Sequence, residues 1–583
     1  MLDNFDYVVK KIDTGKILEN HVTGFKKYPS ILRTIVKYFL RALVREKAIN
    51  DFLEAHKYTR NFDFIDAVFN RIKIDCHIKQ NEIQNIPARG RVLVVANHPL
   101  GGIDGLTLLR VVGMVRRDVR IVANNILMSI DPLEGLMLPV NSFSGNTRKA
   151  DIDRITQALE NDEAVIIFPS GEVSRAGAKG IRDRSWLPGF LKIAEKTSAP
   201  ILPIFVKGRN SALFYLTSRV SQVASMLLLP REMLNYKGKI ELIIGQSIEA
   251  ETLFKLPLQR KQIAQLVSKH LRSLGSKKAP VFETKKSIIH PVERQSLRNA
   301  LQKAEQLGET ADGKKILLAE YDERSPIMDE IGRLREMTFR AVGEGTGKQK
   351  DLDHYDRYYR HLILWDDASL EIAGAYRLGE VWRWSDQSPD HLYSSSLFEY
   401  KPNMKALLNE GLELGRSFVQ PQYWGLRSLD YLWQGIGAYL HSNQEVRYLF
   451  GPVSLSSSLP KSARDLLIHF YKTNYPDQDA LVKARIPYVV EKSVEETLKA
   501  DFPGHDLRLE QDQLKERLEY VGVKIPTLFK QYSELCQPGG VKFCGFSIDP
   551  GFNHCVDGFI VVDLEKVKEK KRARYIRNHK DEN

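Results

Sequence analysis

The first half of the chain alternates short apolar runs with amphipathic segments. The apolar runs are five or six residues long, which is typical of buried strands. The predicted strands are residues 91–96, 119–123, 164–168, 201–206 and 240–245. Between them, residues 151–162 and 187–199 repeat their apolar positions with the period of a helix. Strands that alternate with helices predict an α/β domain built around a largely parallel sheet.

The pattern changes near residue 275, where a polar, lysine-rich stretch with prolines begins. Beyond it, strand-like runs and a helical repeat return and predict a second mixed α/β domain. The strand-like runs are residues 316–320, 361–365, 371–377 and 447–455, and the helical repeat covers residues 326–342. The predicted divisions are an N-terminal helical, membrane-associating region (1–78), a first domain (79–275), a linker (276–291), a second domain (292–565) and a basic tail (566–583).

Residues 28–47 form an amphipathic pattern of their own near the start of the chain. Arg33, Lys37, Arg41 and Arg45 recur every four residues, and Phe39 belongs to the broad apolar stripe beside them. Such a helix suits the surface of an anionic membrane, with its cations at the headgroups. The alternative is a helix packed on the core with a solvated charged edge. The apolar segment 211–230 supports the membrane-binding interpretation.

Composition narrows the range of partners. In 583 residues, Lys and Arg outnumber Asp and Glu by 86 to 73, which favours anionic partners. The positive residues are dispersed and match no nucleic-acid module, so we expect no nucleic-acid partner. Four cysteines make no disulfide framework, and their spacing fits no zinc site, so we expect no metal. The chain shows no secretory signal and no apolar run of membrane-spanning length, which predicts a cytoplasmic or peripheral membrane protein.

A histidine and an aspartate follow the first predicted strand of the sheet. His98 and Asp104 stand six positions apart, with a glycine-containing turn between them. A neutral imidazole can take a proton from a hydroxyl, and a nearby carboxylate can hold its tautomer. The alternative is a simple turn in which the aspartate caps the next helix. Loops at strand ends in α/β folds collect catalytic groups, but the residue types of this stretch alone leave both interpretations open.

Three motifs in fixed order resemble the glycerolipid (lysophospholipid) acyltransferase family. They are the His98–Asp104 pair, the block FPSGEVSR at residues 168–175 and the block APILPI at residues 199–204. The resemblance covers residues 79–248 and implies that His98 is the general base on an acceptor hydroxyl and Asp104 its orienting partner. It also implies an acyl donor that is a thioester of acyl carrier protein or coenzyme A, with no bound cofactor.

Two departures from this family's pattern affect the expected acceptor. Five residues separate His98 from Asp104 where the family has four, so the loop must bulge to bring the carboxylate back to the imidazole. In the second block, Ser170 replaces the usual glutamate. The resemblance implies that this block binds the acceptor, through the residues Ser170, Gly171, Glu172 and Arg175. Its alteration argues against a glycerol-phosphate acceptor.

The second half contains a different set of charged residues. Asp353 and Asp356 are three residues apart, as are Glu413 and Arg416, and Arg377 ends a predicted strand. Converging carboxylates can orient or deprotonate an amine, and arginines can hold a carboxylate through two hydrogen bonds. The alternative is ordinary ion pairing on the surface.

Together with Arg335 and Phe339, these residues resemble the GNAT-like N-acyltransferases of the ornithine lipid synthase and acyl-homoserine lactone synthase group. The resemblance implies that Glu413 and Asp356 are catalytic groups that order the amine. It assigns substrate binding to Arg335, Phe339, Asp353, Arg377 and Arg416, with both Arg377 and Arg416 on a carboxylate.

The order of the two domains resembles that of bifunctional ornithine lipid synthases. We therefore expect N-acylation of an amino acid, ornithine by default, with a 3-hydroxyacyl group, and then O-acylation of that hydroxyl. The expected partners are acyl carrier protein and the cytoplasmic side of the bacterial inner membrane. Two alternatives stay open: a lysophospholipid acyltransferase with a non-catalytic second domain, and a non-enzymatic, hemolysin-like membrane-perturbing protein.

Overall fold

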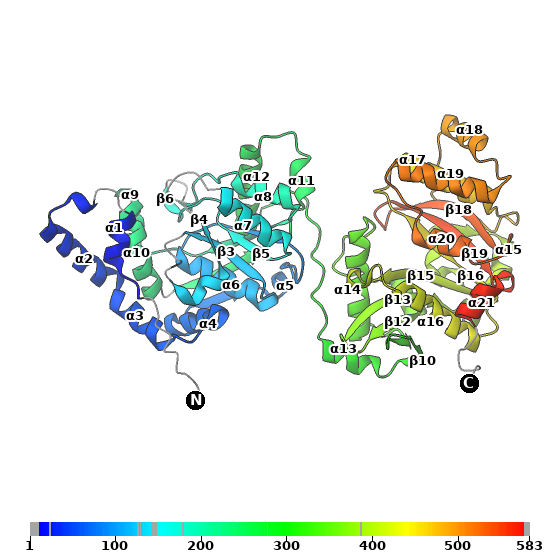
Figure 1. The fold of residues 1–583 in the computed structure, drawn as a ribbon, viewed down its shortest axis with the longest axis horizontal. Helices are drawn as coiled ribbons and strands as arrows, with labels where there is room; N and C mark the ends of the chain where they lie inside the picture. Colours follow the sequence, from blue (N-terminus) through cyan, green and yellow to red (C-terminus); the bar gives the residue numbers. More distant parts are fainter. Residues whose placement is uncertain are drawn as a thin grey trace. The chain divides into compact units, whose positions relative to one another are not determined.

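The computed structural model describes residues 11–21, 25–124, 128, 130–140, 149–177, 180–220, 222–236, 238–276, 278–384 and 388–576. The chain forms two compact units, Met1–Ser287 and Ile288–Asn583. Residues 278–293 form neither helix nor strand and lead from the last helix of unit 1 to the first helix of unit 2 (Figure 1). Of the basic tail expected at 566–583, residues 577–583 lie outside the described residues.

Unit 1 is built on a seven-stranded sheet. Its order is β1 (Asp75–Ile78), β9 (Lys239–Ile244), β8 (Ile201–Lys207), β2 (Val92–Ala96), β5 (Ala164–Ile167), β3 (Val119–Asn124) and β4 (Met137–Val140). All neighbours run parallel except β8 and β9. The predicted, largely parallel α/β sheet is confirmed.

Helices cover both faces of this sheet. On one face lie α4 (Asn61–Ile72) and α6 (Gly102–Val115), and on the other lie α7 (Lys149–Glu160), α8 (Gly189–Thr197) and α12 (Arg260–Ser276). Alternate residues of β2 enter the two cores, Val94 on the first face and Val95 on the second. Because β2 is central and buried on both faces, the loop that follows it starts from a rigid support.

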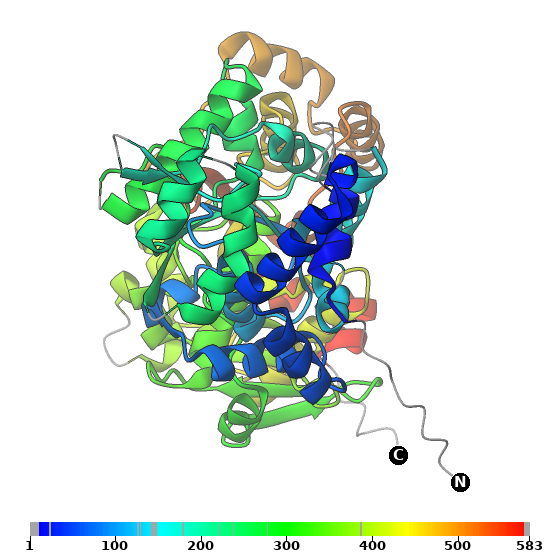
Figure 2. The same cartoon turned by 90° about the vertical axis from the view of Figure 1, so that its left-hand side faces the viewer.

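The N-terminal helices are α1 (Thr14–His21), α2 (Ser30–Val44) and α3 (Glu46–Ala55), shown in blue in Figure 2. Helix α2 packs on α1 and on α10 (Gln222–Asn235). The smaller helices of unit 1 are α5 (Gln80–Ile83), α9 (Ala212–Val220) and α11 (Ala250–Phe254). In the described part of the chain, we find no helix with the length and apolar character needed to cross a bilayer.

Unit 2 is built on an eight-stranded sheet. Its order is β10 (Glu305–Glu309), β11 (Lys315–Ala319), β12 (Arg360–Asp366), β13 (Glu371–Gly379), β15 (Gly411–Val419), β16 (Tyr448–Leu455), β19 (Cys555–Asp563) and β18 (Val541–Asp549). The pairs are antiparallel except β15 and β16, whose parallel pairing covers only Gly411–Glu413 and Tyr448–Phe450. Beyond Glu413 the two central strands therefore separate.

Helices α14 (Pro326–Ala341) and α16 (Ser428–Ser442) pack against this sheet. Further helices are α13 (Arg294–Leu301), α15 (Pro402–Leu408), α17 (Lys461–Asn474), α18 (Lys492–Asp501), α19 (Leu507–Tyr520) and α20 (Thr527–Ser533). Residues 569–575, expected in a solvated tail, form helix α21 (Glu569–Tyr575). Arg574 Nη2 lies 2.7 Å from Asp430 Oδ1 of α16, so α21 is docked on the domain.

Candidate active sites

His98 lies directly after β2 and faces the first turn of α6. Its Nδ1 is 3.0 Å from Asp104 Oδ2, so the longer loop does return the carboxylate to the imidazole. The same oxygen accepts hydrogen bonds from the backbone N–H groups of Leu100 (2.8 Å) and Gly101 (3.1 Å). Gly101 takes the left-handed backbone (φ +79°) that lets the turn close. The structure therefore brings these two predicted residues together.

The surroundings of this pair leave one ring nitrogen available. Asp104 is fully buried, whereas the His98 side chain keeps 18% of its surface exposed. Phe168 stacks on the imidazole with ring centroids 3.9 Å apart. Burial raises the pKa of the Asp104 carboxyl, and its hydrogen bond to His98 acts in the opposite direction. With Nδ1 turned to the carboxylate, Nε2 is the nitrogen that can take a proton from an acceptor.

The block at residues 168–175 lies beside His98. The backbone N–H of Ser174 donates to the carbonyl oxygen of His98 at 2.7 Å. Ser170 Oγ donates to the Glu172 carbonyl oxygen (2.8 Å), and Gly171 turns the chain with φ +68°. Arg175 Nη2 is paired with Glu172 Oε2 at 2.6 Å, so these two predicted acceptor residues neutralise one another.

Three cations of α2 lie near acidic residues of the preceding segment. Lys37 pairs with Glu19 of α1 (2.6 Å) and Arg41 with Asp13, the residue before α1 (3.1 Å), while Arg33 Nη1 lies 3.9 Å from Glu19. Arg45 ends the helix in a left-handed backbone conformation. The exposed residues of α2 include the apolar and aromatic Ile31, Leu32, Ile35, Tyr38 and Phe39, and the cations Arg41 and Arg45 are exposed as well.

In unit 2 the predicted charged residues form a buried network. Arg335 Nη1 lies 2.7 Å from Asp356 Oδ1, and Arg377 Nη1 lies 2.9 Å from Asp353 Oδ1 and 3.2 Å from Asp356 Oδ1. Burial opposes ionisation of Asp356, but the guanidinium groups of Arg335 and Arg377 outweigh it and lower the pKa of this carboxyl. Arg377 is fully buried, so in this structure its charge is balanced by the two aspartates.

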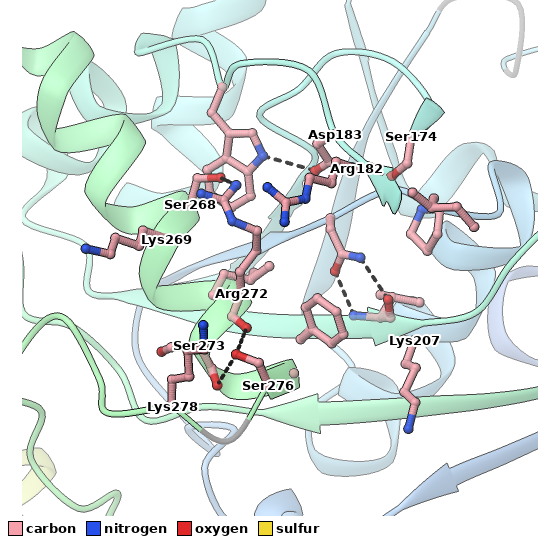
Figure 3. Close-up of a pocket in the computed structure, with 18 of the residues that line it drawn as sticks. Ser174, Arg182, Asp183, Lys207, Ser268, Lys269, Arg272, Ser273, Ser276 and Lys278 are labelled. Carbon is pink, nitrogen blue, oxygen red and sulfur yellow. Dashed lines mark hydrogen bonds between the residues drawn. The ribbon is translucent and has the colours of Figure 1, made fainter. Parts of the chain in front are cut away.

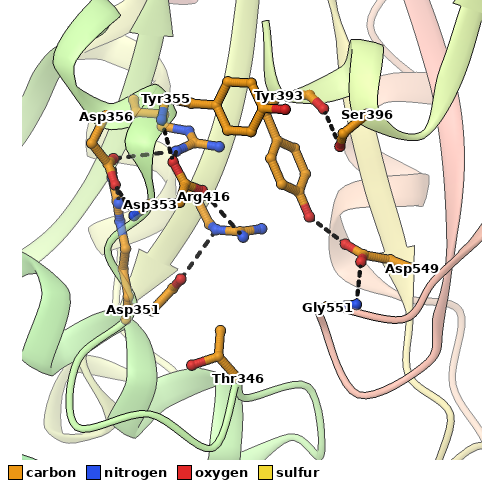
Figure 4. Close-up of polar contacts among 12 residues, drawn as sticks. Thr346, Asp351, Asp353, Tyr355, Asp356, Tyr393, Ser396, Arg416, Asp549 and Gly551 are labelled. Carbon is orange, nitrogen blue, oxygen red and sulfur yellow. Dashed lines mark hydrogen bonds and ion pairs between the residues drawn. The ribbon is translucent and has the colours of Figure 1, made fainter.

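Arg416 lies at the edge of this network. Its Nε is 3.1 Å from Asp351 Oδ2, and its guanidinium stacks over the rings of Tyr393 (4.4 Å) and Phe552 (4.6 Å). Its backbone is left-handed (φ +47°), which is strained for a side chain of this size. Figure 4 shows the guanidinium on the side of the network that faces the hydrogen-bonded side chains of Tyr393 and Asp549. The predicted Phe339 packs against Phe552 and so supports this stack.

Glu413 lies where β15 and β16 stop pairing. Its buried carboxylate accepts hydrogen bonds from the hydroxyl of Tyr359 and from the backbone N–H of Ser394 (3.0 Å). Burial raises the pKa of Glu413, and the hydrogen bonds with Ser394 and Tyr359 act against it. The Arg377 guanidinium stacks over the Tyr359 ring at 4.7 Å, which links Glu413 to the buried network.

Several residues of this second site were not predicted. Asp351 lies only two residues before the predicted Asp353, so proximity along the chain could have found it. Tyr393 donates to the carboxylate of Asp549, and Ser454 Oγ donates to Asp557 at 2.6 Å. Burial and the nearby Asp549 raise the pKa of Asp557 to about 7. The two aspartates follow Arg416 by more than a hundred residues, and no local motif marks them.

The described residues contain no grouping of three or more histidine, cysteine, aspartate or glutamate side chains arranged to hold a metal ion. Within the described part of the chain, all four cysteines are free thiols. The chemistry of both sites is therefore considered in terms of their acids, bases and cations.

Each half of the chain is similar to a different class of known acyltransferases. A family profile described as "Acyltransferase" matches residues 23–271, and one described as "Acetyltransferase (GNAT) domain" matches residues 334–434. The chain is 32% identical over 303 residues to a glycine N(alpha)-acyltransferase of Bacteroides thetaiotaomicron, covering 50% of this chain and 89% of the relative. It is 32% identical over 253 residues to a lyso-glycine lipid O-acyltransferase of Phocaeicola vulgatus, covering 42% and 88%.

The chain belongs to the bifunctional acyltransferases of aminolipid synthesis, the family of ornithine lipid synthases. An L-ornithine N(alpha)-acyltransferase of Brucella abortus is also similar, at 26% identity over 279 residues, 46% of this chain and 85% of the relative. The family and the enzyme class expected from the sequence are confirmed. This acyltransferase transfers acyl groups to nitrogen and oxygen acceptors.

Proposed function

We propose that this acyltransferase builds a two-chain, phosphorus-free aminolipid in two steps. Unit 2 transfers a 3-hydroxyacyl group from a thioester to the α-amino group of an amino acid. Unit 1 then transfers a second acyl group to the 3-hydroxyl of that single-chain product. The presence of both acyltransferase types in one chain supports this order, because the first transfer leaves a free hydroxyl for the second.

The observation that carries the oxygen transfer is the His98–Asp104 pair. Nε2 of His98 removes the hydroxyl proton as the oxygen attacks the thioester carbonyl carbon. Asp104 holds the Nδ1–H tautomer and stabilises the imidazolium. When the tetrahedral intermediate collapses, the carbon–sulfur bond breaks and the proton passes to the departing thiolate, so the histidine is restored. The hydrogen bond from Ser174 to the His98 carbonyl fixes the backbone of the base.

For the nitrogen transfer, the proposed groups are Glu413, Arg416 and the buried network. Glu413 orders the amine beside the point where β15 and β16 separate. Arg416 holds the carboxylate of the amino acid, since it lies at the edge of the network and its side chain keeps 10% of its surface exposed. Asp356 and Arg377, enclosed by their ion pairs, act as positioning residues for this wall of the site. The amine forms the amide bond, and the thioester releases its thiol.

Glycine is the proposed headgroup, and ornithine is the second candidate. The glycine N(alpha)-acyltransferase of B. thetaiotaomicron is 32% identical to this chain, and the ornithine enzyme of B. abortus is 26% identical. The higher identity favours glycine in place of the ornithine that the sequence analysis took by default.

The proposed donor is an acyl carrier protein thioester, with acyl-CoA as the alternative. A formal net charge of +13 supports attraction of an acidic carrier. The proposed location is the cytoplasmic side of the bacterial inner membrane. The apolar surface of α2 suits insertion at the edge of the acyl chains, where the single-chain intermediate resides.

The decisive experiment expresses the full chain in a host without aminolipids and identifies the lipids by mass spectrometry. The wild type is expected to yield a two-chain glycine lipid, and His98→Ala the single-chain N-acyl glycine. His77→Ala, an exposed histidine on β1, is the matched control. Altered phospholipid chains without any aminolipid would instead support a lysophospholipid acyltransferase, and membrane leakage without new lipid would support a non-enzymatic role.

A further inference from the structure

Unit 1 contains a cavity of about 550 Å³ that the proposed chemistry has not used. It is bounded by α12, by the end of β8 and by the hairpin of β6 (Arg175–Gly177) and β7 (Gly180–Arg182). Five cationic side chains line it, and Figure 3 shows them around the opening: Arg182, Lys207, Lys269, Arg272 and Lys278. We call this space the cationic cavity.

The charges of the cationic cavity are poorly balanced. Asp183 is the single carboxylate among the described residues that line it. Its oxygens are already engaged by neutral donors, namely the Ser174 hydroxyl, the backbone N–H of His98 (3.2 Å) and the Trp186 indole N–H (3.0 Å). Of the five cations, Lys207 is paired outside the lining, with Glu241 at 2.6 Å. The other four have no comparable ion pair in the described part of the chain, and Figure 3 shows the Lys269 side chain extending outward from α12.

Two of these cations repel one another. Burial of part of its side chain and the nearby Arg182 guanidinium lower the pKa of Arg272, while Asp183 acts in the opposite direction. The hydrogen bond of Arg272 Nη1 to Ser268 Oγ (2.8 Å) holds the side chain toward the cavity without neutralising it. A cluster of like charges held in place is stabilised when an anion enters.

The cationic cavity adjoins the proposed base of the oxygen transfer. Asn97 and Pro99, the residues on either side of His98, form part of its wall. The Asn97 amide is fixed by two hydrogen bonds to the backbone of Val206, at 2.7 and 2.8 Å. Lys269 and Lys278 lie on the opposite side from Ser174 and Lys207 in Figure 3. Asp183, which also lines the cavity, accepts a hydrogen bond from the backbone N–H of His98 (3.2 Å), so the cavity lies beside the backbone of the proposed base.

We propose that the cationic cavity binds the phosphate group of the 4′-phosphopantetheine arm that carries the acyl chain to unit 1, an inference that rests on the proposed function. The arm bears its phosphate at one end and its thioester at the other, so a phosphate held by the cations of the cavity leaves the thioester free to extend toward the loop of His98. A lone carboxylate of the acceptor would need one guanidinium, whereas phosphate oxygens can engage several cations. The arm has two sources, coenzyme A and acyl carrier protein.

The test compares donors with and without the phosphate in full-length protein. A synthetic N-(3-hydroxyacyl)glycine is supplied, so unit 2 is not needed for turnover. The double variant Lys269→Ala/Lys278→Ala removes two exposed cations and leaves the packing of α12 intact. For acyl-CoA we expect roughly a tenfold or greater rise in KM, from the loss of charged hydrogen bonds. For acyl-pantetheine, which lacks the phosphate, we expect no change.

The controls separate this inference from its alternatives. Lys261→Ala, an exposed lysine of α12 outside the cavity, should behave as wild type. If KM rises only for acyl carrier protein thioesters, the cavity binds the arm of the carrier protein. If KM rises for both donors, the cavity binds the phosphopantetheine arm that the two donors share. Equal losses for acyl-CoA and acyl-pantetheine, or a raised KM for the glycine acceptor instead, would overturn the inference.

Calorimetry of coenzyme A binding separates the two proposals. If His98→Ala binds coenzyme A as wild type does but cannot O-acylate, both proposals stand. Suppose that the wild type shows no O-acylation but binds coenzyme A, and that the double variant has lost one of these binding sites. The proposed function then fails, and the cavity assignment survives. If the double variant binds coenzyme A with wild-type stoichiometry and affinity and also keeps the wild-type KM for acyl carrier protein thioesters, the cavity assignment fails.

Discussion

The two proposed sites of this chain differ in how their charged groups are held. In unit 1, a partly exposed imidazole is backed by one buried carboxylate, and the rest of the turn serves to hold that pair. In unit 2, three arginines and three aspartates are joined by ion pairs, and at their centre Arg335, Arg377 and Asp356 are fully buried. A hydroxyl needs a base to become a nucleophile, whereas an amine, once neutral, needs mainly to be held. We therefore attribute the difference between the two sites to the acceptor, a hydroxyl in one and an amine in the other, because both proposed reactions use a thioester donor.

The largest effect is expected at the base of unit 1. His98→Ala should lower O-acylation of N-(3-hydroxyacyl)glycine by about 10²–10⁴-fold, the usual cost of losing a general base. N-acylation by unit 2 should stay at the wild-type rate, and both are measured by mass spectrometry of the products. Parallel loss of the two activities would show that the sites are not separable in this way.

The next effect is one of stability in unit 2. Arg377→Met leaves Asp353 and Asp356 without a main partner and should cost about 3–5 kcal/mol in the free energy of unfolding of that unit. Denaturant unfolding measures it, with O-acylation by unit 1 as a check that the other unit is intact. The control, Arg427→Met, breaks an exposed pair with Asp430 and should cost less than about 1 kcal/mol. Equal stability of both variants would refute a structural role for the network.

The free energy of unfolding of unit 2 should depend on pH through Asp557. Burial raises the pKa of Asp557 from 3.8 to about 7, so the folded state holds this proton more tightly than the unfolded state. The free energy of unfolding of unit 2 should therefore fall as pH rises from about 4 to about 7, by an amount on the order of a few kcal/mol. Asp557→Asn should flatten that slope in denaturant titrations at several pH values. An unchanged slope would mean that Asp557 does not titrate as proposed.

The smallest effect is expected at α2. Phe39→Ser removes one exposed aromatic residue and should weaken binding to lipid vesicles by roughly tenfold, the transfer free energy of one such side chain. Vesicle sedimentation measures the bound fraction. Met114→Ser, an equally exposed apolar position on α6, is the control. Loss of binding in the control alone would move the membrane-facing surface away from α2.

Some elements of the fold were predicted from the sequence because their apolar residues follow the periodicity of a strand or a helix. Strand β2 is a run of five buried apolar residues, and α14 keeps a helical repeat, so both are visible without tertiary contacts. Strand β15 was missed because it carries Glu413 and Arg416 in a buried sheet, where function overrides the apolar pattern.

In the two candidate sites, residues close together in the sequence were predicted, and residues brought together only by the fold were not. His98 and Asp104 are six residues apart, so a motif could join them. The arginine network gains Asp549 and Asp557 only through the pairing of β18 and β19, which spacing along the chain does not reveal. The contact of the basic stripe of α2 with lipid stays a prediction, and its ion pairs with Asp13 and Glu19 are contacts that spacing along the chain does not reveal.

The pairing of Lys37 and Arg41 with acidic neighbours has a practical consequence at the bench. Added salt weakens electrostatic binding to a membrane, but it does not weaken hydrophobic binding. Cell envelopes washed in concentrated sodium chloride should therefore keep this enzyme, and a mild detergent should release it.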